Sequence, residues 1–226
     1  MKAEGARILL PGASGVIGAA LARRLHAEGA RLALAGRDPA ALARVSAATG
    51  GAPTRRFDAY DLESCAATVP WAAERLDGLD AVVVCVGVAG FGPAQEVGDD
   101  IAEHLFTVNA LAPMAFLRAA LPVVPPEGAL AAVTGVVVDA APAGMADYTA
   151  SKAALAGWLT ALRRERRRSG PAVLDVRLPH TETGFADRAV TGHAPALPPG
   201  RTVEEAVDLL MEALLAPGPG PRRASA

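Results

Sequence analysis

The sequence predicts an α/β fold in which a doubly wound parallel sheet of six or seven strands carries helices on both faces. Six short apolar runs alternate with six longer segments in which apolar residues recur three and four positions apart. Buried parallel strands joined by amphipathic helices produce this alternation. A glycine-rich turn between the first run and the first helical segment indicates the same fold.

The expected elements divide the chain into one domain and a tail. We expect strands at Arg7–Leu10, Arg31–Ala35, Thr54–Phe57, Ala81–Val86, Ala129–Thr134 and Val173–Leu178, and helices at about 16–28, 39–48, 63–75, 99–120, 147–168 and 203–215. The segment from Thr183 to Gly200 is rich in proline and is expected to be irregular. Residues 1–216 therefore form a single predicted dinucleotide-binding domain, and the proline- and glycine-rich residues 217–226 a flexible tail.

Composition argues against several classes of partner and site. The chain has 226 residues, enough to bury roughly 70% of its unfolded surface, and a net charge of −2, which gives no reason to expect a nucleic acid or a membrane surface as partner. The basic run Arg163–Arg168 ends a predicted helix, where arginines complement the helix dipole. No apolar run reaches the ~20 residues of a membrane span, and two cysteines cannot form a disulfide framework. We therefore expect a cytoplasmic protein. We expect no metal site, because the histidines lack metal-ligand spacing.

The glycine-rich turn is the first candidate binding site. Gly12, Gly15 and Gly18 follow the first strand and open the first helix, with Ser14 and Ile17 between them. Glycine permits a tight turn and close approach of the backbone to a pyrophosphate, which the N–H groups at a helix start can hold. A strand before the turn and a helix after it favour nucleotide binding in a Rossmann-type fold over a merely tight turn.

The end of the second strand bears on the choice of cofactor. A carboxylate at this place would bind the adenosine ribose hydroxyls, whereas an arginine accommodates a 2′-phosphate. Gly36 ends the strand and Arg37 follows it, which favours NADP(H) over NAD(H). The competing interpretation is that Arg37 is solvated while Asp38 caps the next helix before Pro39, and both interpretations can hold together.

Tyr148 and Lys152 form the central chemical motif. They lie four residues apart in a predicted helix, so they share one face. A nearby ammonium favours the phenolate, which predicts a lowered pKa for Tyr148 and proton transfer near neutrality. The alternative is an ordinary surface pair. Lysine occurs only twice in a chain whose other basic residues are arginine, so its presence here favours a titratable ammonium.

From about residue 7 to residue 215 the chain resembles the short-chain dehydrogenase/reductase family. The residues that carry the resemblance are the glycine turn, Asp58, Asp61, Gly87, Asn109, the Tyr-x-x-Ser-Lys sequence at 148–152 and Pro179. The resemblance implies hydride transfer between a nicotinamide and a small carbonyl or alcohol, with Tyr148 as acid and base. It also implies that Lys152 lowers that pKa and holds the nicotinamide ribose, that Asn109 supports a water relay, and that Asp58 lies at the adenine.

The chain departs from the family pattern at several positions. Its three glycines follow a G-x-x-G-x-x-G spacing, so Val16 holds the usual middle-glycine position, and Val84–Gly87 replaces the family's Asn-Asn-Ala-Gly. Gly135 stands thirteen residues before the tyrosine, where the family has its catalytic serine. We expect Thr134 to supply the missing hydroxyl. If Thr134 points into the sheet instead, the site lacks one donor to the substrate oxygen.

The segment after the sixth strand should meet the nicotinamide. In the family, proline and glycine are followed by a threonine that contacts the nicotinamide amide. Here His180 replaces the glycine after Pro179, and Thr181 or Thr183 is expected to take the threonine's role. His180 is either a second proton-transfer group or, as we prefer, a local hydrogen-bonding residue that shapes the pocket.

Two hypotheses follow about function, and one about assembly. The first is an NADP(H)-dependent oxidoreductase of small carbonyls or alcohols. The second, motivated by Gly135 and the altered 84–87 turn, is a non-catalytic or weakly catalytic NADP(H)-binding protein that senses redox state or supports a partner. The family's seventh strand is expected to be absent or rudimentary, so we expect a homodimer through the helices at 99–120 and 147–168. Their small residues would permit close packing: Ala110, Ala112, Ala115, Ala119, Ala153, Ala154, Ala156 and Gly157.

Overall fold

The computed structural model describes residues 1–196 and 198–216. Its elements are, in order, β1 (Arg7–Pro11), α1 (Val16–Ala27), β2 (Arg31–Gly36), α2 (Pro39–Ala47), β3 (Thr54–Arg56), α3 (Leu62–Leu76), β4 (Ala81–Val84), α4 (Asp99–Phe106), the π-helix η1 (Thr107–Leu111), α5 (Ala112–Ala120), β5 (Ala129–Val133), α6 (Val137–Ala140), α7 (Ala146–Arg166), β6 (Ala172–Val176), the 3₁₀ helix η2 (Ala186–Arg188) and α8 (Val203–Leu215). Strands and helices alternate along the chain, which confirms the predicted α/β class.

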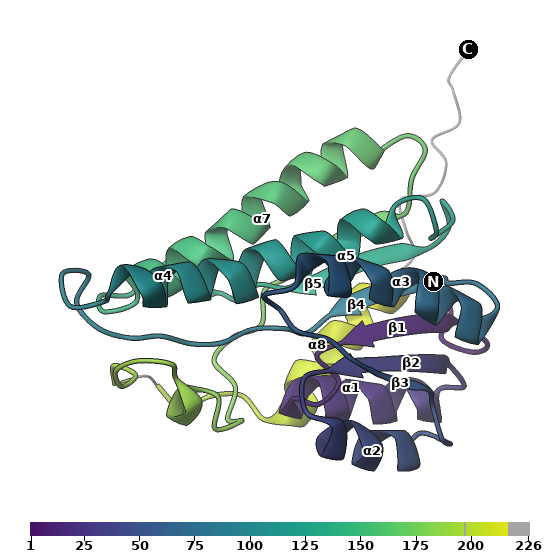
Figure 1. Ribbon diagram of the computed structural model, residues 1–226, viewed down its shortest axis with the longest axis horizontal. Helices are drawn as coiled ribbons and strands as arrows, with labels where there is room; N and C mark the ends of the chain where they lie inside the picture. The colour runs from purple at the N-terminus through teal and green to yellow at the C-terminus, as the bar shows by residue number, and fades with distance from the viewer. Residues whose placement is uncertain (197, 217–226) are drawn as a thin grey trace.

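Six parallel strands form one sheet in the order β3-β2-β1-β4-β5-β6 (Figure 1). β1 and β4 are neighbours at its centre, although two strands and three helices separate them in the chain. The strand order therefore reverses between β1 and β4. In open α/β sheets, ligands bind outside the carboxyl ends of the strands at such a point. The predicted doubly wound topology is confirmed.

Helices cover both faces of the sheet (Figure 1). α1, α2 and α8 pack on one face, where Ile8, Leu10 and Leu210 are buried. α3, α5 and α7 pack on the other, where Leu9 and Phe116 are buried. Successive residues of β1 thus enter opposite cores, as the two-residue period of a strand requires. No helix in the described part of the chain is long and apolar enough to cross a membrane.

Most predicted elements agree with the structure to within two residues, and the differences have physical reasons. The helix predicted at 99–120 is α4, η1 and α5 in succession, with a π-helical turn in the middle. α6 and η2 were not predicted, because such short helices have no apolar periodicity to recognise. Among the described residues the sheet has six strands. The predicted tail at 217–226 lies outside those residues.

Half of the small residues expected at a dimer contact lie inside the chain. Ala110, Ala112, Ala115 and Ala156 are at most 6% exposed. They pack their helices against the body of the same chain, so they are not available to a second copy. The other four, Ala119, Ala153, Ala154 and Gly157, are half-buried or exposed.

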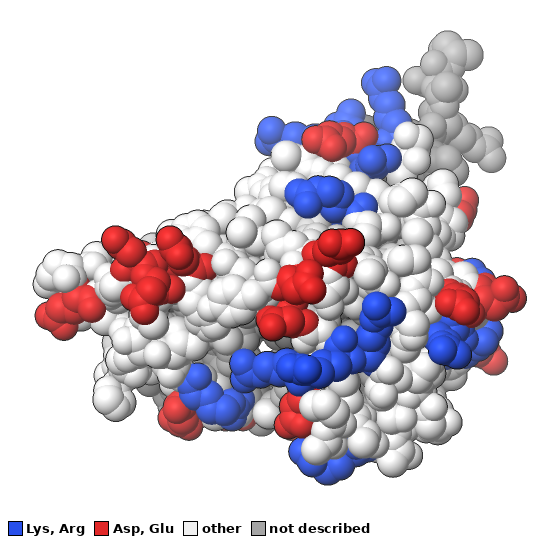
Figure 2. Space-filling model, viewed as in Figure 1, with Lys and Arg blue, Asp and Glu red and all other residues white. Residues whose placement is uncertain are grey.

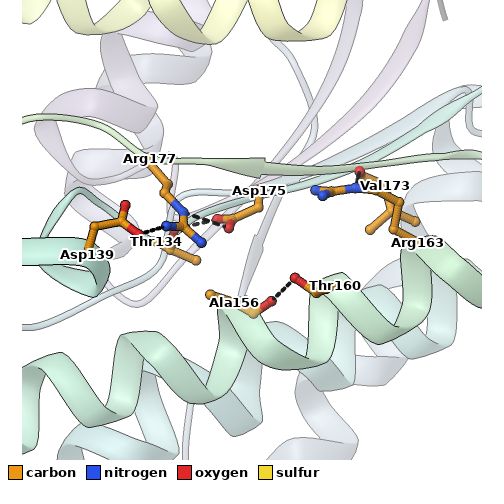
Figure 3. Close-up of polar contacts among 8 residues, drawn as sticks. All are labelled: Thr134, Asp139, Ala156, Thr160, Arg163, Val173, Asp175 and Arg177. Carbon is orange, nitrogen blue, oxygen red and sulfur yellow. Dashed lines mark hydrogen bonds and ion pairs between the residues drawn. The ribbon is translucent and has the colours of Figure 1, made fainter. Parts of the chain in front are cut away.

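β6 is the last strand of the sheet in order and pairs with β5. From α7, Arg163 donates through Nε to the carbonyl oxygen of Val173, at 2.8 Å (Figure 3). Further along the strand, the side chain of Asp175 is only 7% exposed. A carboxylate at this depth needs hydrogen-bond donors around it, and Thr134 and Arg177 supply them.

Candidate active site

The glycine-rich turn follows β1 at the carboxyl end of the sheet (Figure 1). Gly12 has a φ of +91°, and a Cβ on it would lie 2.6 Å from the carbonyl carbon of Cys85. A Cβ on Gly18 would lie 2.2 Å from the carbonyl oxygen of Gly12. Backbone therefore packs directly on backbone here, and only glycine fits at these two positions.

The start of α1 is suited to an anion. Gly15 is the N-cap and provides no side-chain cap, and the first turn contains no acidic residue. The positive end of the helix dipole is thus not neutralised by the helix's own residues. A pyrophosphate fits this position, because backbone N–H groups and dipole both favour negative charge. Of the residues expected to hold it, Gly12, Ser14 and Gly15 lie in the turn before α1, and Ile17 and Gly18 lie in the first turn of α1.

Arg37 and Asp38 follow β2 and have separate surroundings. The Asp38 carboxylate accepts hydrogen bonds from the N–H groups of Ala40 at 2.9 Å and Ala41 at 3.1 Å, and Pro39 is the first residue of α2. The predicted cap is therefore confirmed. Arg37 is exposed and lies outside the cap, so the cap leaves its guanidinium available for another partner.

Asp58 lies in the turn that follows β3. Its carboxylate accepts a hydrogen bond from the N–H of Tyr60 at 3.0 Å, and Asp61 caps α3 through the N–H of Ser64 at 2.9 Å. The Tyr60 hydroxyl also hydrogen-bonds Nδ1 of His104 on α4, and the two rings are stacked with centroids 5.5 Å apart. Sequence reasoning missed this pair, because its members lie 44 positions apart and carry no shared motif.

Tyr148 lies in the first turn of α7 among aromatic side chains. Its ring centroid is 6.3 Å from that of Phe91 and 6.5 Å from that of Phe185. Burial raises the pKa of Tyr148 to about 12, so the phenol is protonated at neutral pH. The sequence predicted a pKa lowered by Lys152, and for the protein chain alone that direction is wrong. Loss of hydration disfavours the phenolate here.

Lys152 lies one turn further along α7 and is 3% exposed. Its Nζ donates to the carbonyl oxygen of Val133, the last residue of β5, at 3.2 Å. Burial lowers the pKa of Lys152 to about 8, while Cys85 and Asp175 act in the opposite direction. A Cβ on Gly87 would lie 2.9 Å from Nζ. The glycine after β4 therefore lets the ammonium approach the backbone.

Asn109 sits in the π-helical turn η1 and is fully buried. Its Oδ1 accepts from the N–H of Val88 at 2.8 Å, while its Nδ2 donates to the carbonyl oxygen of Val88 and to Oγ of Ser151, each at 3.0 Å. The Ser151 hydroxyl donates to the carbonyl oxygen of Tyr148 at 2.7 Å. Asn109 thus joins the segment after β4 to the turn that carries the tyrosine. π-helical turns of this kind are frequent at functional sites.

Thr134 follows β5, and its hydroxyl donates to Asp175 on β6 (Figure 3). Asp175 also accepts from Nε of Arg177 at 3.1 Å, and Arg177 pairs with Asp139 on α6. A hydroxyl has one hydrogen and an ionised carboxylate only accepts, so Thr134 has no hydrogen left for a substrate oxygen. The expectation that Thr134 replaces the missing serine is not met in this arrangement; its hydroxyl points toward the neighbouring strand.

The segment after β6 makes mostly local contacts. Thr181 donates from Oγ1 to the carbonyl oxygen of Pro179 at 2.9 Å, and Oγ1 of Thr183 accepts from the N–H of Phe185 at 3.2 Å. Nε2 of His180 lies 3.4 Å from a carboxylate oxygen of Glu182. This contact agrees with the preferred interpretation of His180 as a locally bonded residue.

The chain around Phe185 to Ala194 docks beside the tyrosine. The N–H of Val190 donates to the carbonyl oxygen of Ala89 at 2.8 Å, and the N–H of Phe91 donates to the carbonyl oxygen of Thr191 at 3.0 Å. These bonds tie the segment to the chain after β4 and bring Phe185 to the tyrosine ring. The sequence indicated an irregular segment here but not where it would dock.

The sequence profile of short chain dehydrogenases matches residues 6–193. The chain belongs to this family. It is 36% identical over 165 residues to the cyclic-di-GMP-binding biofilm dispersal mediator protein of Escherichia coli, a match that covers 71% of this chain and 67% of that protein. Its fold matches a short chain dehydrogenase from Burkholderia cenocepacia J2315 in complex with NADP, with a TM-score of 0.84, 26% identity and 100% and 95% of the two chains covered. It also matches BdcA in complex with NADPH, with a TM-score of 0.80, 28% identity and 92% and 86% covered.

The difference from the short-chain dehydrogenase pattern at position 135 has a structural explanation. Gly135, which stands where the family serine is expected, has a φ of +110°. A serine in that conformation would be strained by about 1–3 kcal/mol. The backbone after β5 has therefore adapted to glycine. In this short-chain dehydrogenase the tyrosine, lysine and asparagine are present without a serine at the family's position after β5.

Proposed function

We propose that this chain is an oxidoreductase that transfers a hydride between NADP(H) and a small carbonyl or alcohol, with Tyr148 as acid and base. One observation carries the proposal. A protonated phenol, walled by Phe91 and Phe185, lies one helical turn from the buried ammonium of Lys152. Both groups are on the helix that Asn109 ties to the segment after β4. A desolvated proton donor and a desolvated cation one turn apart on the same helix suit reduction of a carbonyl.

The glycine turn supports the choice of a dinucleotide cofactor. Two of its glycines leave no space for a Cβ, and the helix start that follows favours an anion. Relatives of the same fold, 26% and 28% identical, have been crystallised with NADP and NADPH. When bound, the nicotinamide supplies or accepts the hydride. The residues proposed to hold the cofactor are Gly12, Ser14, Gly15, Ile17, Gly18, Arg37, Asp58, Gly87, Lys152, Pro179, Thr181 and Thr183.

The residues of the chain divide the proton chemistry among them. In the direction of reduction, Tyr148 gives its phenolic hydrogen to the substrate oxygen, and its raised pKa keeps that hydrogen in place until the oxygen becomes basic. The ammonium of Lys152 stabilises the phenolate that results. Asn109 keeps the turn in register through Ser151, and we propose that it also supports a water path to bulk solvent. Thr134 takes no part, because its hydrogen is given to Asp175.

Turnover tests the proposal directly. NADPH is mixed with a panel of small ketones and aldehydes, and loss of the reduced-nicotinamide absorbance is followed for the native protein and for Tyr148→Phe. The variant should lose about 10³-fold in rate, because general acid catalysis contributes on the order of 10²–10⁴. Its NADPH affinity should stay within a few fold, which shows that the fold is intact. Equal rates in the two proteins would contradict the role of Tyr148 as acid and base.

A second candidate is an NADP(H)-binding protein with little or no turnover. Gly135 in the serine position and the committed hydroxyl of Thr134 both favour it. The relative at 36% identity is named for binding cyclic di-GMP, which makes that nucleotide the first ligand to try. Calorimetric titration of cyclic di-GMP with and without NADPH separates the candidates. Binding without turnover on any substrate supports the second, and turnover without cyclic di-GMP binding supports the first.

We further propose that residues 1–216 act as one catalytic domain and that two copies pair through α4, α5 and α7. Leu111 in η1 is 45% exposed, and the Arg118 guanidinium lies 5.9 Å from the ring centroid of the half-buried Trp158 on α7. Exposed apolar surface, an aromatic ring and an arginine on these helices are typical of an interface core. The mass in solution, measured by light scattering, tests this; a monomeric mass would contradict it.

A further inference from the structure

β3 is the strand at one end of the sheet, and it carries two consecutive arginines, Arg55 and Arg56. Basic side chains form a band across this face of the molecule, over the region of β2 and β3 (Figure 2). Arg37, at the end of the neighbouring strand β2, is a third arginine of this edge. The two arginines of β3 have the same charge but different surroundings, and that difference suggests a role for one of them.

Arg55 is engaged with the helical layer of the α3 face. Its guanidinium carbon lies 5.7 Å from the ring centroid of Trp71 on α3. Because successive side chains of a strand point to opposite faces, Arg56 must point to the other face, on the side of α2. Arg56 is exposed there, whereas Arg55 is half-buried.

Arg56 is the register partner of Gly36, the last residue of β2. A Cβ on Gly36 would lie 2.5 Å from Oγ of Ser14, so the hydroxyl of the glycine turn fills the place of the missing side chain. Neighbouring strands are about 4.8 Å apart, and partners in register project to the same face. Ser14 and Arg56 therefore stand side by side on the α2 face of the sheet, and Arg37 follows directly after Gly36.

The charges near the end of β2, around Arg37 and Arg56, favour binding of an anion. Within the described residues, neither Arg37 nor Arg56 has a carboxylate oxygen within 4 Å of its guanidinium; ion pairs of this kind are made by Arg7, Arg24, Arg177 and Arg201. The acidic residues nearest to them in sequence are Asp38 and Asp58, whose carboxylates accept hydrogen bonds from the backbone N–H groups of Ala40, Ala41 and Tyr60. Two unpaired guanidiniums and a hydroxyl at one strand end match a phosphate, which arginine binds through a planar pair of N–H donors.

We propose that Arg56 is a second arginine for the 2′-phosphate of NADP(H), acting with Arg37 and Ser14. The proposal deepens the proposed function and rests on it, since the adenosine ribose of a dinucleotide lies at the end of the second strand of this fold. It assigns cofactor discrimination to an edge-strand residue that no motif identifies. It also explains why Gly36 has no side chain: any side chain there would displace Ser14.

Adjacent arginines provide a matched control. The dissociation constants of 2′,5′-ADP and 5′-AMP, and of NADPH and NADH, are measured by calorimetry for the native chain and for Arg37→Ala, Arg55→Ala, Arg56→Ala and Arg56→Lys. Arg56→Ala should weaken 2′,5′-ADP and NADPH about tenfold, as loss of a charged hydrogen bond does at an exposed site, and leave 5′-AMP and NADH within twofold. Arg55→Ala should leave all four within twofold, and Arg56→Lys should recover part of the loss.

The outcomes separate this inference from the proposed function. Equal effects of Arg55→Ala and Arg56→Ala would overturn the inference, because net charge alone would then explain them. An unchanged NADPH to NADH ratio in Arg56→Ala would overturn it too. If the native chain binds neither dinucleotide, the proposed function itself fails. A native preference for NADPH that disappears only in Arg37→Ala would leave the proposed function standing without Arg56.

Discussion

The cofactor region and the substrate region of this chain are built by different means. Around β1, α1 and β2, backbone packs on backbone: Gly12 lies against Cys85 and Gly18 against Gly12. Around the ends of β5 and β6, side-chain hydrogen bonds hold the structure: Lys152 donates to the carbonyl oxygen of Val133, and Thr134 donates to the carboxylate of Asp175. Backbone contact tolerates almost no change, whereas a side-chain network admits alternative residues. This difference explains why the glycine turn can be recognised from the sequence, whereas in the substrate region Gly135 stands in place of the family's serine.

Among the tests of this comparison, the largest expected effect concerns the backbone contacts of the cofactor region. Gly18→Ala puts a Cβ 2.2 Å from the carbonyl oxygen of Gly12, so the turn must open. NADPH affinity should fall by at least about 10²-fold, and the free energy of unfolding by about 2–3 kcal/mol, typical of backbone strain. Gly157→Ala is the control, since its Cβ would meet nothing within 4 Å. Calorimetry and urea unfolding measure both quantities, and similar affinities in the two variants would contradict the comparison.

The second test concerns the side chains of the substrate region, through the pH dependence of the free energy of unfolding. Lys152 has a folded pKa of about 8 against an ordinary 10.5. Between these values the unfolded chain binds more protons than the folded one, so the free energy of unfolding should rise with pH across this window. The rise amounts to at most about 3 kcal/mol. Lys152→Met should lack it, because methionine has a similar shape and no charge.

Urea unfolding of both proteins at pH 7.5, 9 and 10.5 measures that difference. Comparing the two proteins at each pH cancels groups such as Tyr148, whose raised pKa acts in the opposite direction at higher pH. Parallel curves for the native chain and the variant would show that the ammonium is not buried as the structure has it.

The smallest expected effect concerns Thr134. Thr134→Val removes a hydroxyl that donates to Asp175, so turnover should stay within about threefold, far from the 10²–10³-fold cost of losing a donor to the substrate oxygen. The free energy of unfolding should fall by about 1–2 kcal/mol, because a buried carboxylate loses a donor. Thr134→Ser should restore stability. A hundredfold loss of kcat/KM in the valine variant would make Thr134 a catalytic donor after all.

Local patterns predicted the elements that depend on local physics. The helix beginning after Asp38 and the turn at Gly12 are encoded within a few residues, by a capping carboxylate and by a backbone that admits no Cβ. The pair Tyr148 and Lys152 was identified for the same reason: helix geometry fixes its spacing. These parts of the site were accessible from the sequence.

Contacts distant in sequence, and the effects of burial, were not accessible. Thr134 and Asp175 are 41 residues apart, and nothing in either segment indicates the other. The raised pKa of Tyr148 depends on how deeply the ring is buried, which spacing does not report. The π-helical turn at Asn109 likewise depends on bonds to Val88 and Ser151 from other elements.

The arginine on the last strand has a consequence for how the protein behaves in a crowded solution. In β6, the N–H of Ala172 donates to the carbonyl oxygen of Gly128, and the carbonyl oxygen of Val176 accepts from the N–H of Thr134. Backbone groups of successive residues point to opposite sides of a strand, so the carbonyl of Val173 faces away from β5. An outward row of such groups is a template on which a strand of another molecule can assemble. With Arg163 bonded to that carbonyl, a foreign strand must first expel a cation, so the border of the sheet discourages fibrous self-association.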